Sequence, residues 1–251
     1  MEEQTPMWNQ TPLTLRQLNP ADFCELSGLE GGVYVLNLTE EFQRRLTLEA
    51  IRLIDKLLDQ VAGDVCAYAL ITTNQLFCLR VGGLIYADTF GAVAGIFATV
   101  SKACQQAIDF CIPTLAIITG HAVGAGYVFS LAHDYRLMST THGYIFMNEA
   151  DLGMSLTPGN MAVLHSKLPV STFQEAVLAG KRYNGKAAAA VGIVHAAFPS
   201  SVLLQKGIKK AMEHKARNWN RKAYQALKME MYKTTVQELE SGGVGFARSA
   251  N

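Results

Sequence analysis

The sequence predicts an α/β protein with one sizeable domain and a mostly parallel β-sheet. Short apolar segments alternate along the chain with amphipathic segments of about ten residues or more. Strands that alternate with such helices pair in parallel through right-handed crossovers. The chain has 251 residues, of which 49% are hydrophobic and 17% charged, so its core needs no disulfide or metal to support it.

The first 31 residues are rich in Pro, Asn, Gln and Thr and end in a glycine pair, which predicts an N-terminal appendage outside the core. The core is expected at residues 32–200, and a C-terminal helical region with a tail at residues 201–251. Apolar runs predict strands at residues 33–38, 66–72, 114–119, 135–138 and 143–147. Periodic apolar positions predict helices at residues 48–60, 89–110, 127–133, 159–168, 170–179, 185–191 and 201–239.

Local signals define several of these boundaries. Thr47 is a suitable N-cap for the first helix, and Pro113 separates the second helix from the strand that follows it. The first helix carries an apolar stripe, formed by Ile51, Leu53, Ile54, Leu57, Leu58 and Val61.

The segment from Cys111 to Ala132 contains no Asp, Glu, Lys or Arg and has about the length of a transmembrane span. A proline and a glycine-rich turn divide it into two runs that each have the size of a buried element. We therefore interpret it as a buried strand that leads into a buried helix, and we expect no membrane partner.

Composition excludes further classes of function. The formal net charge is +1, without the basic excess of a nucleic-acid-binding protein. The acidic N-terminus MEEQTPMWNQ resembles neither a secretory signal nor a transit peptide, and the last three residues do not match an S-K-L peroxisomal signal. The odd number of scattered cysteines indicates buried thiols in a reducing compartment: Cys24, Cys66, Cys78, Cys104 and Cys111.

Three segments carry a resemblance to a known family: PTLAIITGHAVGAGYVFSLAHDYR at residues 113–136, FMNEADLG at residues 146–153, and LAGKRY at residues 178–183 with AVGIV at residues 190–194. In this order and at this spacing, the sequence resembles the crotonase superfamily of enoyl-CoA hydratases and isomerases over roughly residues 33–233. It is most similar to the plant-type peroxisomal Δ3,Δ2-enoyl-CoA isomerases.

The resemblance implies a crotonase (ClpP-like) spiral fold of ββα units with a helical C-terminal region. It also implies an acyl-CoA substrate, assembly as a homotrimer or hexamer, and a cytoplasmic or peroxisomal location. The chemistry shared by the superfamily is stabilisation of a thioester enolate by two backbone N–H groups, which requires no metal or redox cofactor. Such donors act best when they are preorganised in a dry site.

By position, the resemblance assigns one oxyanion donor to the N–H of Ala125, in the turn GHAVGAG. A turn from a strand into a helix leaves N–H groups unpaired at the positive end of the helix dipole. The small residues Gly124 and Gly126 would let a substrate carbonyl approach the backbone, although a tight turn alone would also explain them.

The other donor falls on the N–H of Leu79. Related proteins read something like Phe-Ser-Asn-Gly-x-Asp-Leu in this loop, whereas this chain has Arg80 at the glycine position and Gly82 at the aspartate position. A backbone N–H survives any change of side chain, but Arg80 lacks the conformational freedom of glycine. The loop is therefore expected to be reshaped, adapted to another thioester, or disabled.

Glu149 is the candidate catalytic base. It lies in Asn148-Glu149-Ala150-Asp151-Leu152-Gly153, which matches the isomerase motif Asn-Glu-x-x-x-Gly. Apolar neighbours should raise the pKa of a carboxyl group at this position, as suits a general base. Asp151 is the nearest rival, and a solvated loop glutamate is the alternative without a catalytic role.

Val128 stands where hydratases of the superfamily carry a second glutamate. One carboxylate can move a proton between two carbons but is poorly suited to activating water, so isomerisation is favoured over hydration. Val128 is assigned to the substrate site together with Gly124 and Gly126. Arg45 is the first candidate for binding the CoA phosphates, and further candidates lie in the C-terminal helices, namely Lys215, Arg217, Arg221 and Lys222.

The sequence thus predicts an isomerase that moves a double bond from position 3 to position 2 of an acyl-CoA. Two alternatives stay open. The protein could have lost catalysis and serve as a CoA-binding or assembly subunit, as the changes at Arg80 and Gly82 would allow. It could instead be a recruited enzyme of specialised metabolism that retains Glu149 for proton transfer to a different substrate.

Overall fold

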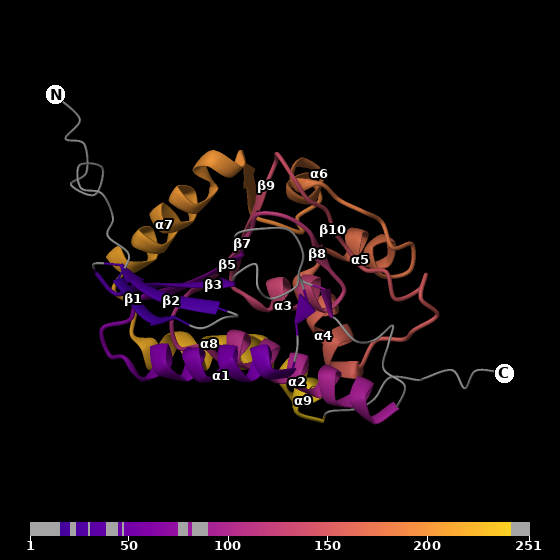
Figure 1. The fold of residues 1–251 in the computed structure, drawn as a ribbon, viewed down its shortest axis with the longest axis horizontal. Coiled ribbons are helices and arrows are strands. Elements are labelled where there is room, and N and C mark those ends of the chain that lie inside the picture. Colours follow the sequence, from indigo (N-terminus) through magenta and orange to yellow (C-terminus); the bar gives the residue numbers. More distant parts are fainter. Residues whose placement is uncertain are drawn as a thin grey trace.

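The structure is a computed structural model, shown in Figure 1. It describes the chain at residues 16–20, 24–29, 31–38, 45–46, 48–74, 80–81 and 90–241. The architecture has three layers, in which helices cover both faces of one central sheet (Figure 1).

The central sheet has seven strands in the order β1-β2-β3-β5-β7-β9-β11. The pairs β1–β2 and β2–β3 are antiparallel, and every pair from β3 onward is parallel. The prediction of a mostly parallel sheet is therefore confirmed. The strands are β1 (Arg16–Pro20), β2 (Cys24–Leu29), β3 (Val33–Leu38), β5 (Ala69–Asn74), β7 (Thr114–Ile118), β9 (Tyr135–Ser139) and β11 (Ala196–Phe198).

Two short sheets complete the strand inventory of the described residues. In one of them β4 (Arg45–Leu46) pairs in parallel with β6 (Arg80–Val81). In the other, β8 (Ala122–Val123) pairs in parallel with β10 (Ile145–Phe146).

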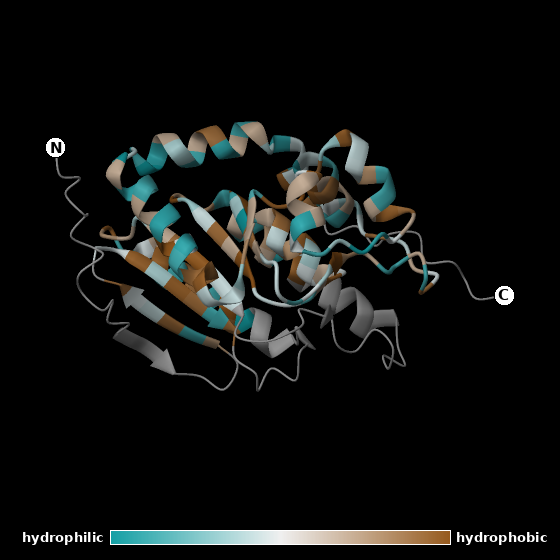
Figure 2. Ribbon diagram, turned by 90° about the horizontal axis from the view of Figure 1, so that it is seen from above, coloured by the Kyte–Doolittle hydropathy of each residue, from teal (hydrophilic) through white to brown (hydrophobic). Residues whose placement is uncertain are grey.

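Alternate side chains of the parallel strands enter two separate cores, as expected for strands that are buried on both faces. Val35, Ile71 and Ile117 pack on the face covered by α7 (Ser200–Ala216). Leu36 and Leu70 pack on the opposite face, against the helices α1 (Leu48–Gly63), α2 (Phe90–Asp109) and α3 (Ala125–Ala132). The strands are coloured largely as hydrophobic in Figure 2, whereas the helices mix both colours.

The helices α1 to α6 begin and end within a few residues of the predicted ranges. They are α1 (Leu48–Gly63), α2 (Phe90–Asp109), α3 (Ala125–Ala132), α4 (Pro158–Lys167), α5 (Val170–Val177) and α6 (Gly185–Ala190).

The prediction of one long helix at residues 201–239 is wrong, because the chain forms α7, α8 (Arg221–Met231) and α9 (Lys233–Ser241) there. Asn218 has a φ of 46°, a left-handed conformation that ends a helix. The side chain of Asn220 then caps α8 by accepting a hydrogen bond from the N–H of Ala223 at 3.0 Å.

Two strands lie within the segment that was expected as an N-terminal appendage. β1 and β2 pair with each other at the edge of the central sheet, and Cys24 and Leu26 of β2 are fully buried. β2 pairs along its whole length with β3, so backbone hydrogen bonding includes this segment despite its polar composition.

A buried ion pair links α8 to the core. The ammonium group of Lys228 lies 2.9 Å from Oδ1 of Asp134, and both side chains are at least nine-tenths buried. The same carboxylate accepts hydrogen bonds from the N–H and hydroxyl groups of Thr114 and from the hydroxyl of Tyr224. Such a pair is costly to break on one side only, because one charge is then left buried alone.

The uncharged stretch from Cys111 to Ala132 folds as β7, β8 and α3, all within the core. No helix in the described part of the chain is long and apolar enough to span a bilayer. Cys24 and Cys104 are buried free thiols whose pKa burial raises to about 12. Cys66 is exposed and Cys111 half-buried, and Cys78 lies outside the described residues.

Candidate active site

The turn between β7 and α3 depends on the backbone of Gly124. This residue has a φ of 57° and a ψ of −119°, a conformation that residues with a Cβ rarely adopt. It lets the chain leave β8 and enter α3 without an intervening loop. The expected tight strand-to-helix turn is therefore present.

The first N–H groups of α3 are available as donors. The helix begins at Ala125, and the first helical hydrogen bond runs from the N–H of Val128 to the carbonyl of Gly124 at 3.1 Å. The N–H groups of Ala125, Gly126 and Tyr127 consequently have no partner within the helix. All eight residues of α3 are buried, so the positive end of its dipole acts in a poorly solvated environment.

The pairing of β8 with β10 brings a distant segment to this turn. The N–H of Ala122 donates to the carbonyl of Tyr144 at 3.0 Å, and the N–H of Gly124 donates to that of Phe146 at 3.1 Å. The chain leaves β10 immediately before the motif that contains Glu149. These two hydrogen bonds therefore set the position of Glu149 relative to the N-terminus of α3.

The carboxylate of Glu149 lies directly over Gly124. A Cβ atom placed on Gly124 would be 2.8 Å from Oε1 of Glu149, closer than Cβ atoms approach other atoms in proteins. The second oxygen, Oε2, accepts a hydrogen bond from the N–H of Asn148 at 2.9 Å. Glu149 and Ala125 thus lie on either side of one glycine, although 24 positions separate them in the sequence.

The motif around Glu149 forms a compact turn. The N–H of Leu152 donates to the carbonyl of Asn148 at 3.1 Å, and the N–H of Met154 donates to that of Glu149 at 2.8 Å. Gly153 closes the turn with a φ of 67°, which accounts for the glycine of the motif on backbone grounds. Asp151, the rival acid, is exposed on the outer side of the turn, whereas Glu149 is half-buried.

Burial raises the pKa of Glu149, and hydrogen bonds from the backbone N–H groups of Glu149 and Asn148 partly oppose this effect. A carboxylate with a raised pKa is a stronger base than one in water. The electrostatics of Glu149 therefore suit proton abstraction from carbon.

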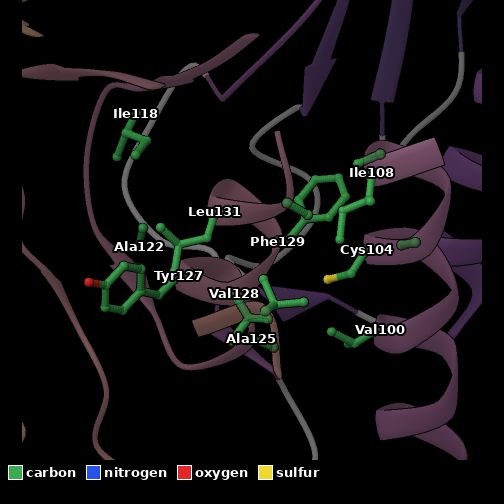
Figure 3. Close-up of a cluster of buried hydrophobic side chains, with 14 of the residues drawn as sticks. Val100, Cys104, Ile108, Ile118, Ala122, Ala125, Tyr127, Val128, Phe129 and Leu131 are labelled. Carbon is green, nitrogen blue, oxygen red and sulfur yellow. The ribbon is translucent and has the colours of Figure 1, made fainter. Parts of the chain in front are cut away.

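Val128 is fully buried and belongs to the larger hydrophobic core. Figure 3 shows Val128 and Ala125 on the side of α3 that faces Val100 and Cys104 of α2, whereas the ring of Tyr127 points to the opposite side. The position three residues past Ala125 therefore holds a methyl-bearing side chain in an apolar setting. No carboxylate stands there to share a water molecule with Glu149.

A neutral histidine braces the other end of α3. His133 is buried, and its Nδ1 donates to the carbonyl of Phe129 while Nε2 accepts from the hydroxyl of Thr72, both at 2.9 Å. Desolvation lowers the pKa of His133 to about 4, so the ring is uncharged at neutral pH. His133 therefore has a structural role in this fold. No group of His, Cys, Asp or Glu side chains that could hold a metal ion occurs among the residues with described positions.

For the other expected site residues, the structure describes either nothing or the backbone alone. Leu79, Gly82 and Gly83 fall within residues that the structure does not describe, so the loop expected to supply the oxyanion donor at Leu79 stays a prediction. Arg45 is in β4, whose backbone pairs with Arg80 in β6.

One of the C-terminal CoA-binding candidates has a structural role in this fold. Arg221 donates hydrogen bonds to the carbonyls of Asp64 and Ala62 at the end of α1, at 2.6 and 2.9 Å. Its guanidinium group therefore links α8 to the end of α1. The sequence contains no signal for its contact with α1.

A family model described as enoyl-CoA hydratase/isomerase matches residues 85–243, which is more than half of the chain. The chain belongs to this family. Among its relatives, enoyl-CoA delta isomerase 2, peroxisomal, of Arabidopsis thaliana is 26% identical over 214 residues, covering 80% of this chain and 89% of the relative. Enoyl-CoA delta isomerase 3 of the same plant is 27% identical over 212 residues, with the same coverage of both chains.

Solved structures of the family share the fold. An apo enoyl-CoA isomerase of Mycobacterium tuberculosis superposes with a TM-score of 0.80 at 18% identity, covering 88% of this chain and 96% of the other. An enoyl-CoA hydratase/isomerase family protein of Pseudomonas syringae gives 0.79 at 21% identity, covering 88% and 95%. The chain therefore has the crotonase fold, and the resemblance to the plant isomerases is confirmed.

Proposed function

We propose that this member of the family is an enoyl-CoA isomerase that moves a double bond from position 3 to position 2 of an acyl-CoA. The observation that carries the proposal is the closeness of the Glu149 carboxylate to Gly124, at the N-terminus of α3, where the first three N–H groups have no partner within the helix. In the proposed site, Glu149 would be the base and the N–H of Ala125 a hydrogen-bond donor for an anion, next to each other.

In the proposed mechanism, Glu149 first removes a proton from C2, which lies between the thioester carbonyl and the double bond. The electron pair delocalises over C2, C3 and C4 and onto the thioester oxygen, where the N–H of Ala125 stabilises the negative charge. The protonated Glu149 then returns the proton to C4, and the double bond forms between C2 and C3. Atoms and charge balance without water, metal or redox cofactor.

Isomerisation rather than hydration is favoured by Val128. Hydration requires that a water molecule be held and activated, and this role suits a pair of carboxylates. A buried valine contributes neither a hydrogen bond nor a charge. The names of the Arabidopsis relatives point in the same direction.

The remaining assignments belong to the same proposal. The N–H of Leu79 would be the second oxyanion donor, Gly124 and Gly126 would admit the carbonyl, and Arg45 would contact the CoA phosphates. The functional unit would be a homotrimer or hexamer, located in the cytoplasm or the peroxisome.

The decisive experiment is a spectrophotometric assay of purified protein with a 3-enoyl-CoA, which follows conjugation of the double bond with the thioester. Glu149→Gln keeps the shape of the side chain but removes the base, so turnover should fall by at least about a hundredfold while CoA still binds. Asp151→Asn in the same turn is the matched control and should leave turnover unchanged.

Other outcomes would contradict the proposal in distinct ways. If the wild-type protein binds CoA but converts no 3-enoyl-CoA of any chain length, the protein is a binding subunit or an enzyme for a different substrate. If Glu149→Gln converts 3-enoyl-CoA as fast as the wild type, another group is the base.

A further inference from the structure

A hollow lies on the far side of the sheet from Glu149. It has a volume of about 360 Å³, within the range of small-molecule sites, and opens between α7, the edge strand β11 and its neighbour β9. In Figure 1, α7 runs alongside these strands. Tyr135, Leu137 and Phe198 line its floor, and Lys206, Lys209 and Lys210 line its wall.

This hollow is separate from the candidate active site. Tyr135 pairs with Leu115 near the start of β7, whereas the turn that carries Gly124 follows the opposite end of that strand. Leu137 belongs to the core on the α7 face of the sheet, and α3 belongs to the core on the other face. A ligand in the hollow would not contact Glu149.

Three lysines of α7 face the hollow, and they do not belong to the buried face of the helix. The buried face of the helix consists of small and apolar residues such as Leu203, Gly207 and Ala211. Lys206, Lys209 and Lys210 follow the i, i+3, i+4 spacing of a single helical face, beside that buried face.

The lysines bring uncompensated positive charge to this hollow. Among the described residues, Lys210 pairs with Glu213 at 3.4 Å, and no carboxylate pairs with Lys206 or Lys209. Lys206 lies 5.5 Å from the centre of the Phe198 ring, and Lys210 lies 5.3 Å from that of Tyr135. The hollow therefore combines two available ammonium groups with flat aromatic surfaces.

His195 adds an oriented neutral donor to the lining. Its Nδ1 accepts a hydrogen bond from the N–H of Arg136 at 3.1 Å, and its ring packs against Tyr135 at 5.2 Å between centroids. Desolvation and the nearby charges of Arg136, Lys167 and Lys210 lower the pKa of His195 to about 4. The neutral ring thus carries its hydrogen on Nε2, which remains free to donate.

We propose that the hollow between α7 and the strands β9 and β11 binds a phosphate monoester with a flat aromatic body, such as a nucleoside monophosphate. A phosphate monoester carries a charge of about −1.5 to −2, which matches Lys206 and Lys209 better than a carboxylate does. The rings of Tyr135 and Phe198 can accommodate a base. The same chemistry occurs in a free nucleotide and in the 3′-phosphoadenosine end of CoA.

The test is isothermal titration calorimetry of the full-length protein with adenosine 3′-monophosphate, adenosine, inorganic phosphate and CoA as separate ligands. The nucleotide should bind, and adenosine and inorganic phosphate should each bind at least about tenfold more weakly. The double variant Lys206→Gln/Lys209→Gln should weaken nucleotide binding about tenfold or more. Lys186→Gln, which removes an exposed lysine of α6, is the matched control and should change nothing.

Two results would overturn this proposal: no nucleotide binding by the wild type, or equal binding by the wild type and the double variant. If inorganic phosphate bound as tightly as the nucleotide, the proposal that the ligand has a flat aromatic part would be wrong. The number of CoA molecules bound per chain distinguishes the two possible ligands of the hollow. If the wild type binds two CoA molecules per chain and the double variant one, the ligand is CoA. If both proteins bind one CoA molecule per chain and only the variant loses nucleotide binding, the ligand is a free nucleotide. None of these readouts depends on isomerase activity.

Discussion

Gly124→Ala should separate the position of the Glu149 carboxylate from its chemistry, because the carboxylate itself is left untouched. The alanine methyl group would be built 2.8 Å from Oε1 of Glu149, where ordinary contact begins at 3.4 Å. The backbone of Gly124 is fixed by its hydrogen bond to Phe146 and by the start of α3, so the carboxylate is the group that must move.

The structure gives the expected magnitudes. Oε1 must retreat by at least about 0.6 Å, and a misplacement of about 1 Å can cost about a hundredfold in rate, so kcat should fall by about 10- to 100-fold. Placing a Cβ at a φ of 57° and a ψ of −119° should also cost about 1–3 kcal/mol of stability. For a chain of this size that corresponds to a decrease in Tm of about 2–12 °C.

The rate should be measured with a 3-enoyl-CoA at saturation and at a temperature well below the Tm of the variant. Gly192→Ala is the matched control: its φ of 77° imposes similar strain, and its Cβ would lie 2.9 Å from Cγ of Pro169 instead of a carboxylate. This control should lose stability but keep its kcat. A folded Gly124→Ala protein with wild-type kcat would refute the reasoning, because the observed position of Glu149 would then be irrelevant to turnover.

Three further predictions follow from the described contacts. Because burial raises the pKa of Glu149, kcat/KM should fall as the pH decreases through a midpoint above the usual glutamate value of about 4.3. The same raised pKa means that the charged side chain destabilises the folded protein, so Glu149→Gln should raise the free energy of unfolding at neutral pH. This gain in stability should shrink as the pH is lowered through the raised pKa. Val128→Glu should lower the free energy of unfolding by several kcal/mol in urea titrations, because the new carboxylate is buried without a partner. Lys228→Met should cost about 3–5 kcal/mol by leaving Asp134 buried and unpaired, and adding Asp134→Asn should recover part of the loss.

Periodicity identified most helices and strands because their apolar residues are buried on predictable faces. It failed where other forces decide the structure. β1 and β2 are held by strand pairing, β2 with β3 and β1 with β2, rather than by an apolar pattern of their own. The helix at residues 201–239 is interrupted by a left-handed Asn218 and a capping Asn220, two polar residues that helical periodicity does not register.

The candidate site was accessible from the sequence only through the family motifs. Glu149 and Ala125 are each conspicuous in their own motif, but no local pattern states that they meet. Their meeting depends on β8 and β10, which have two residues each and are too short for any periodicity to detect. The hollow beside α7 was missed for a related reason: a lysine-rich helix face is normally solvated, and only the tertiary structure places Tyr135 and Phe198 beneath it.

The position of Glu149 restricts which residues can stand at position 124. The hydrogen bond from Gly124 to Phe146 brings β10 close to the turn, and the carboxylate that follows β10 then occupies the space in which a side chain at position 124 would lie. The glycine therefore does two things at once: its positive φ allows α3 to start at Ala125, and its missing side chain makes room for the carboxylate of Glu149. A substitution that met only one of these requirements should still fail, so the proposed donor and the proposed base are coupled through a single residue.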